Sequence, residues 1–419
     1  FQRAAAGSVR FDNVVAAAPW TAPSVATIMT GLWPPEHGYG YQEKVSRDLR
    51  LTRLTPEVRT LAEMLEARGY ATTALVANPV LGIGSGLERG FERFELLSGR
   101  TSKLPLLTVA NRLKLLPREL YLDAEGVRQR LESHVDALAE DPRPDFLWLH
   151  VMDPHAPLMQ HPDLPAEPGI DLVGPELTYR REVRYTLAEL ARMIDVLEEH
   201  GLWRDSVFVM VADHGEMFAA DDRGPLMPNR TKTHGHGHAL FSELVRVPLL
   251  IRPPGGREAE LRSAVLASHV DLLRTLEDLM GVDLPLRELD RYSLAPLLAA
   301  APSASAAGGS TAGGPEPPPP LARPYALIGA NHSGPQQRAL RSSRHKLIEY
   351  EEDRLPPQLF DLELDPAERR NLIDRDSQRA EEMEEILGVA WGSLDRMEGE
   401  AVELDAETRE QLRALGYVD

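Results

Sequence analysis

Residues that could carry out chemistry are gathered in a few short polar clusters of this 419-residue chain. The first cluster, Trp20-Thr21-Ala22-Pro23-Ser24, puts a hydroxyl at the expected start of a helix, because Pro23 suits a first turn. Backbone N–H groups and the helix dipole favour an anion there, and a metal that lowered the pKa of Thr21 would make its hydroxyl a nucleophile. The alternative is that Thr21 or Ser24 only caps the helix.

A carboxylate and an imidazole follow the apolar run 206–212. Asp213 and His214 stand where this expected strand ends, and ligands bind beyond the carboxyl ends of strands in parallel sheets. An Asp-His pair at such a place is a natural pair of metal ligands, although the segment Asp-His-Gly could also form an ordinary turn.

Two further segments contribute histidines. Asp153-Pro154-His155 follows the strand-like run 145–151, and Pro154 stiffens the turn and so fixes where His155 points; a plain surface turn is the alternative. Residues 234–238 read His-Gly-His-Gly-His. The glycines let the backbone approach a ligand closely, and three imidazoles in five residues suggest metal or anion binding, with a flexible loop as the alternative.

Together these clusters supply a hydroxyl, a carboxylate and several imidazoles at strand ends and helix starts. That inventory predicts metal-assisted ester hydrolysis. A Ser-His-Asp hydrolase fits less well, because no Gly-x-Ser-x-Gly segment occurs in the chain.

The elements that must position these side chains alternate between strand-like and helix-like segments. Expected strands are 11–15, 71–77, 145–151, 206–212 and 247–251, and expected helices are 23–30, 60–68 and 179–200. This alternation predicts an α/β fold with a mostly parallel central sheet flanked by helices.

The composition shifts near residue 299. Residues 299–324 are rich in Ala, Gly, Ser and Pro and should form a linker, because such a stretch cannot bury a core. The linker separates a catalytic domain at 1–298 from a small α+β domain at 325–419. Expected strands there are 325–329, 339–350 and 358–362, and expected helices are 377–387 and 406–415.

Charge and composition narrow the classes of partner. The 46 Lys and Arg residues against 65 Asp and Glu residues give a net charge of −19, which repels polyanions and sets non-specific nucleic-acid binding aside. The absence of cysteine excludes disulfides, thiolate zinc sites and Cys nucleophiles. No apolar run approaches the ~18 residues of a membrane span.

The ordered series of motifs resembles the sulfatase family of the alkaline phosphatase superfamily, and it runs almost end to end. The segments that carry the resemblance are, in chain order, Phe11-Asp12-Asn13, Thr21-Ala22-Pro23-Ser24, Thr30-Gly31-Leu32-Trp33-Pro34, Glu36-His37-Gly38, Asp153-Pro154-His155, Asp213-His214-Gly215-Glu216, Gly235-His236-Gly237, Arg246-Val247-Pro248-Leu249, Leu359-Phe360-Asp361-Leu362 and Glu368-Arg369-Arg370-Asn371-Leu372. The resemblance implies an alkaline-phosphatase-like fold.

The resemblance also implies roles for individual residues. Thr21 stands at the position of the nucleophile, which also touches the metal, and Asp213 and His214 stand at positions of metal ligands. His155 and His236 stand where the family binds the anionic oxygens of the substrate or assists the leaving group.

Two more residues are candidates for substrate binding. His238 lies beside His236, and the sequence does not choose among His234, His236 and His238. Asn78 could face the site, although a turn cap also suits it. The implied cofactor is a divalent ion (calcium, magnesium, manganese or zinc), and the implied substrate is a small anionic ester.

One departure from the family concerns the nucleophile. Family members that act as sulfatases carry Cys or Ser there, converted to formylglycine, with an Arg four positions on; this chain has Thr21 and Val25. Thr cannot give the aldehyde, but it is the nucleophile in relatives that cleave phosphate diesters and phosphonates. Phosphoryl esters are therefore favoured. A non-catalytic relative that binds anionic sugars or lipids, and a phosphotransferase, are the alternatives.

A second departure concerns the metal site. The family places paired Asp ligands on a strand upstream of the segment that begins here at Phe11, and no acidic residue precedes Phe11. We therefore expect the natural protein to begin earlier by one βα unit of ~30 residues. Without that unit, the metal should bind weakly.

Overall fold

The computed structural model describes residues 2–41, 52–82, 84–97, 122–156, 158, 161, 164, 174–218, 226–227, 235–258, 261–286, 292–299, 323–350, 355–402 and 406–414. The chain divides into two units: the first is Phe1–Ala4, Ser46–Arg204 and Glu400–Asp419, and the second is Ala5–Val45 and Asp205–Gly399. Most of the expected linker lies outside the described residues, and the domain boundaries drawn from the sequence remain a prediction.

The first unit is built on a parallel sheet with the strand order β4-β3-β5. Its strands are β3 (Ala71–Val76), β4 (Arg93–Leu96) and β5 (Asp145–His150). All six residues of β3 are buried, as expected for a central strand covered on both faces. The helix before it, α4 (Leu61–Glu66), starts at a capping box in which the Thr60 hydroxyl accepts from the Glu63 N–H and the Glu63 carboxylate accepts from the Thr60 N–H.

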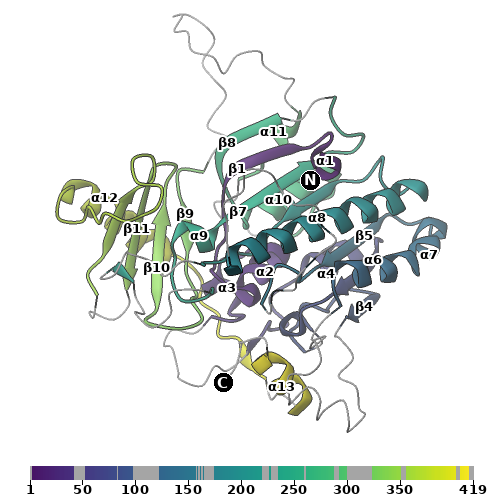
Figure 1. The fold of residues 1–419 in the computed structure, drawn as a ribbon, viewed down its shortest axis with the longest axis horizontal. Helices are drawn as coiled ribbons and strands as arrows, with labels where there is room; N and C mark the ends of the chain where they lie inside the picture. The colour runs from purple at the N-terminus through teal and green to yellow at the C-terminus, as the bar shows by residue number, and fades with distance from the viewer. Residues whose placement is uncertain are drawn as a thin grey trace, which may run out of the picture. The chain divides into compact units, whose positions relative to one another are not determined.

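Helices complete the first unit. The 26-residue helix α8 (Gly174–Glu199) packs along α6 (Ala124–Glu132), as Figure 1 shows. The remaining short elements are α7 (Val135–Glu140), η1 (Pro79–Leu81), and the pair β2 (Thr52–Arg53) and β13 (Glu400–Ala401), with α13 (Ala406–Ala414) near η1. Helix α1 (Gln2–Ala5) opens the chain.

The second unit contains a mixed sheet with the order β6-β7-β1-β8. Strand β1 (Val9–Val15) runs parallel to β8 (Leu261–Ser268) and antiparallel to β7 (Arg246–Arg252), which pairs in turn with β6 (Phe208–Val211). The sequence analysis missed β8, because its first half alternates between partly buried and exposed side chains and carries a charged residue. The associated helices are α2 (Thr21–Thr30), α3 (Pro34–His37), α9 (Ser242–Val245), α10 (Asp271–Met280) and α11 (Ala295–Ala299).

A four-stranded antiparallel sheet, in green and yellow in Figure 1, closes the second unit. Its order is β12-β11-β10-β9, and helix α12 (Ser377–Gly392) packs on β10 and β11. The strands are β9 (Ala326–Ile328), β10 (Gln337–Arg341), β11 (His345–Tyr350) and β12 (Gln358–Asp361). The single strand expected at 339–350 is wrong, because Ser342 accepts and donates hydrogen bonds that turn the chain there into a β10–β11 hairpin.

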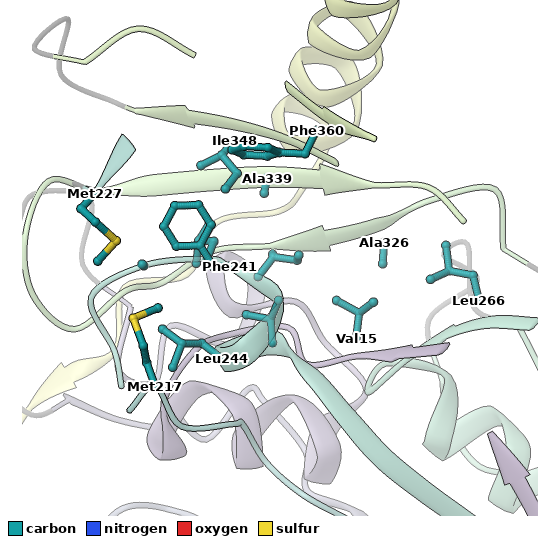
Figure 2. Packing of buried hydrophobic residues seen from close by; sticks show 14 residues of the cluster. Val15, Met217, Met227, Phe241, Leu244, Leu266, Ala326, Ala339, Ile348 and Phe360 are labelled. Carbon is teal, nitrogen blue, oxygen red and sulfur yellow. The ribbon is translucent and has the colours of Figure 1, made fainter. Parts of the chain in front are cut away.

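An apolar cluster joins the two sheets of the second unit (Figure 2). Phe241 and Leu244, near α9, pack with Ile348 and Phe360 of the C-terminal sheet, and all four side chains are at most 1% exposed. The rings of Phe241 and Phe360 meet edge to face with centroids 6.1 Å apart. The segment that follows the histidine-rich stretch is therefore fixed to the C-terminal sheet by buried side chains.

Among the residues that the structure describes, none of the helices combines the length and the apolar character needed to cross a membrane.

Candidate active site

The hydroxyl of Thr21 lies at the start of α2. The helix begins at Thr21 rather than at Pro23, Trp20 is the N-cap in extended conformation, and the helix ends at Gly31 in left-handed conformation. Pro23 fits the first turn because its missing N–H would have no helical partner there. Because Trp20 occupies the N-cap position, neither Thr21 nor Ser24 has the capping role that the alternative interpretation gave them. The Trp20 side chain itself makes no capping hydrogen bond.

The side chain of Thr21 meets that of His214. Thr21 Oγ1 and His214 Nε2 are 3.1 Å apart, and His214 Nδ1 is 2.8 Å from the carbonyl oxygen of Gly215. A carbonyl oxygen can only accept, so Nδ1 carries a proton, and in the singly protonated ring Nε2 turns its lone pair toward Thr21. That lone pair can accept the Thr21 proton or coordinate a metal ion.

Asp213 brings a carboxylate to the same place. Its Oδ1 accepts from the backbone N–H of His214 at 2.9 Å, and its Oδ2 lies 3.5 Å from His214 Nε2. The Thr21 hydroxyl, the Asp213 carboxylate and the His214 imidazole thus converge, and their oxygen and nitrogen atoms suit a divalent cation. Within the described part of the chain, no group of three or more His, Asp or Glu side chains is arranged to hold a metal.

His236 lies beside His214 with ring centroids 4.4 Å apart. Its Nδ1 donates to the Glu216 carboxylate at 2.9 Å, so the neutral ring presents a lone pair at Nε2. Burial, and then the neighbouring His214, lower the pKa of His236 well below its ordinary value, while Asp213 opposes this shift. His236 is therefore held neutral and oriented by Glu216, a residue that the sequence analysis assigned no role.

His238, in the same stretch, differs from His236. The His238 side chain is fully buried, and its carbonyl accepts from the side chain of Gln337 at 3.0 Å. His236 keeps partial exposure, so it is the better placed of the two to meet a substrate. His234 lies outside the described residues.

His155 and Asn78 belong to the first unit, whereas Thr21, Asp213 and His236 belong to the second. The His155 N–H closes a turn on the Met152 carbonyl at 2.8 Å, and its Nδ1 donates to the carbonyl of residue 156. Asn78 caps η1 by accepting from the backbone N–H of residue 80 at 3.0 Å. The structure thus gives Asn78 the capping role, and substrate binding by either residue stays a prediction.

A buried pair that the sequence analysis did not identify supports the Asp213 turn. Ser24 Oγ donates to the Asp213 carbonyl at 2.5 Å and lies 3.3 Å from His269 Nδ1. His269 Nε2 donates to the Ala212 carbonyl at 3.1 Å. Burial lowers the pKa of His269 to about 4, so the ring is neutral. No local pattern marks this pair, because Ser24 and His269 are 245 positions apart.

Comparisons with known proteins agree with this fold. The Sulfatase family model matches residues 1–282. Arylsulfatase A of Bos taurus is 27% identical over 410 residues, which cover 88% of this chain and 77% of that protein. Arylsulfatase K of Gallus gallus is 30% identical over 206 residues, which cover 48% of this chain and only 34% of that protein, so the match spans about a third of its length.

Solved structures extend the comparison to nearly the whole chain. The phosphonate monoester hydrolase of Agrobacterium radiobacter superimposes with a TM-score of 0.63 at 20% identity, covering 94% of this chain and 90% of that one. This likeness in fold confirms the predicted fold class, α/β with an alkaline-phosphatase-like arrangement. Because the family model matches well over half of the chain, the chain belongs to the sulfatase family. Members of this family bind a divalent metal ion.

Proposed function

We propose that this protein is a hydrolase of sulfate or phosphate esters in which Thr21 is the nucleophile and a divalent metal ion assists. The observation that carries the proposal is the 3.1 Å approach of Thr21 Oγ1 to the lone pair of His214 Nε2, with the Asp213 carboxylate beside it. A capping residue would need neither an imidazole nor a carboxylate at its hydroxyl. An imidazole and a carboxylate are both groups that can hold a cation beside a nucleophile.

The proposed residues that would hold the ion are Asp213, His214 and Thr21, and a bound ion would lower the pKa of the Thr21 hydroxyl and offset charge on the ester. Thr21 Oγ1 then forms a bond to phosphorus or sulfur while the bond to the leaving oxygen breaks. The proton that Thr21 loses passes to solvent, and the leaving oxygen, which His236 assists, takes its proton from solvent. Water later cleaves the Thr21 ester and restores the hydroxyl.

Phosphoryl esters are the substrates that this site favours. The residue four positions after Thr21 is Val25, which is buried within α2 and has no group that could steady a formylglycine hydrate. Direct attack by the Thr21 oxygen on phosphorus needs no such residue. The structural similarity to a phosphonate monoester hydrolase supports this assignment.

The test measures hydrolysis of bis-p-nitrophenyl phosphate and p-nitrophenyl sulfate by the full-length protein, with divalent metal and with chelator. We expect metal-dependent turnover of the phosphodiester, lost in Thr21→Ala and partly retained in Thr21→Ser. Thr30→Ser, at the far end of the same helix, is the matched control and should behave as wild type. Equal turnover by Thr21→Ala and wild type would refute the assignment of Thr21 as the nucleophile. If the protein is a phosphotransferase, an added alcohol acceptor would receive the phosphoryl group.

A further inference from the structure

The loop that follows β9, residues 329–336, is fastened to the segment that carries Thr21. The Gly329 N–H donates to the Ala17 carbonyl at 3.0 Å, and the Trp20 indole N–H donates to the Ala330 carbonyl at 2.6 Å. All of these residues belong to the second unit. A loop of the C-terminal sheet is therefore bonded to the residue that immediately precedes the proposed nucleophile.

The same loop is fastened to the histidine-rich segment. The carbonyl of Gly237 accepts from the N–H of His332 at 2.6 Å and from that of Ser333 at 3.0 Å, and the Gly237 N–H donates to the Pro19 carbonyl at 2.9 Å. A side chain at Gly237 would place its Cβ 2.8 Å from the Cβ of His332, and the φ of Gly237 is +78°. Glycine at 237 thus makes the room that the His332 side chain occupies.

The loop holds its own shape. Asn331, which is 3% exposed, donates through Nδ2 to the carbonyls of Ser333 and Pro335, both at 2.9 Å, and accepts through Oδ1 from the Gln337 N–H at 2.8 Å. In the apolar cluster of Figure 2, strands of the C-terminal sheet pack against the residues that follow His238. The position of His332 is therefore set by hydrogen bonds from the loop to the Thr21 segment, by hydrogen bonds to the histidine-rich segment, and by hydrogen bonds of Asn331 inside the loop.

His332 lies against Trp20, the residue before Thr21, and its backbone binds Gly237, the residue after His236. Its ring meets Trp20 edge to face, with centroids 4.8 Å apart and an interplanar angle of 73°. The ring is only partly buried, so it retains a surface for a ligand.

We propose that His332 is a substrate-binding residue, and that the C-terminal sheet thereby supplies one wall of the Thr21 site. Its imidazole N–H donates a hydrogen bond to an oxygen of the bound ester. This inference rests on the proposed function and extends it. No sequence motif near Thr21 predicts it, since His332 lies more than 300 positions further along the chain.

The experiment uses the full-length protein with three variants at this position. His332→Phe keeps an aromatic ring against Trp20 but cannot donate, His332→Asn keeps a donor, and His332→Ala removes both. We expect the KM for bis-p-nitrophenyl phosphate to rise about 10-fold in the Phe and Ala variants, with a smaller change in kcat and partial recovery in the Asn variant. His345→Ala, in β11 of the same sheet, is the matched control.

Binding of inorganic phosphate, measured by calorimetry, separates this inference from the proposed function. If wild type binds phosphate but hydrolyses neither ester, the hydrolase proposal fails while weaker phosphate binding by His332→Phe still supports the contact. If His332→Phe changes the KM for the diester but not the binding of phosphate, His332 contacts the alcohol part of the ester rather than its phosphoryl group. Unchanged KM and unchanged phosphate binding in His332→Phe would overturn the inference, as would a wild type with neither activity nor phosphate binding.

Discussion

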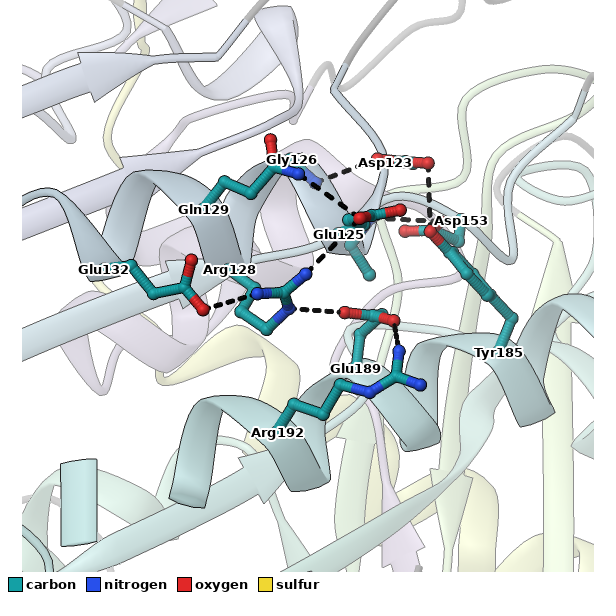
Figure 3. A network of polar contacts seen from close by, with 11 residues as sticks. Asp123, Glu125, Gly126, Arg128, Gln129, Glu132, Asp153, Tyr185, Glu189 and Arg192 are labelled. Carbon is teal, nitrogen blue, oxygen red and sulfur yellow. Dashed lines mark hydrogen bonds and ion pairs between the residues drawn. The ribbon is translucent and has the colours of Figure 1, made fainter. Parts of the chain in front are cut away.

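Asp153 should make the stability of the protein depend on pH. Its side chain is buried, and Oδ1 accepts from the Ala124 N–H at the start of α6 at 3.1 Å (Figure 3). Burial raises the pKa of Asp153 from 3.8 to about 7; the hydrogen bond from Ala124 opposes the shift, and the nearby Asp123 and Glu182 add to it. The folded protein therefore holds this proton at pH values where the unfolded chain has lost it.

The sign and size of the effect follow from linkage. Between pH 4 and 7 the native state binds more protons than the unfolded state, so the contribution of Asp153 to stability falls as pH rises through this window. A shift of about three pKa units corresponds to at most about 4 kcal/mol, since one unit is worth about 1.4 kcal/mol. Above pH 7 both states are ionised and the loss is complete.

Asp153→Asn tests this reasoning. Asparagine keeps an oxygen that can accept from Ala124 but cannot titrate, so the variant should gain stability relative to wild type as pH rises from 4.5 to 8. Urea unfolding midpoints measured across this range would show it, with Asp136→Asn, an exposed carboxylate on α7, as the control. If the midpoints of wild type and Asp153→Asn run parallel with pH, the assigned pKa is wrong.

Three further predictions concern positions away from this carboxyl group. Lys346 and Glu368 form a fully buried ion pair, so Lys346→Met or Glu368→Gln alone should lower the free energy of unfolding by about 3–5 kcal/mol, whereas the double variant should lose clearly less than the sum in a double-mutant cycle. Ser24→Ala removes the bond to the carbonyl after β6 and should weaken divalent-ion affinity about 10-fold by calorimetry; unchanged affinity would contradict the supporting role. Gly90→Ala would bring a Cβ within 2.1 Å of backbone and should lower Tm far more than Gly69→Ala, which has a similar positive φ but open space.

The sequence predicted the central part of the candidate site because that part depends on where elements end. Asp213 lies two residues after the end of β6 and Thr21 begins α2, and both positions can be read from runs of apolar residues. Their convergence follows from the general geometry of α/β sheets, in which strand ends and helix starts meet at one edge. What the sequence suggested about metal binding by Asp213 and His214 stays a prediction.

Other features could not be predicted from one sequence, because they join distant segments. Ser24 meets His269 across 245 positions, and His332 meets Gly237 through backbone bonds that no side-chain pattern reports. The hairpin within 339–350 was missed for a local reason: its turn is formed by polar residues without the glycine or proline that commonly marks one.

The loop after β9 reaches its neighbours mainly through main-chain atoms. Gly329, His332 and Ser333 all bind through backbone N–H groups, and Ala330 through its carbonyl. Every amino acid except proline offers the same donor, so these attachments do not depend on the side chains at 332 and 333, whereas the Asn331 side chain holds the shape of the loop from within. Residues 332 and 333 can therefore be exchanged in a library, or by evolution, while the scaffold stays in place, which makes this loop a natural starting point for changing substrate preference without redesigning the fold.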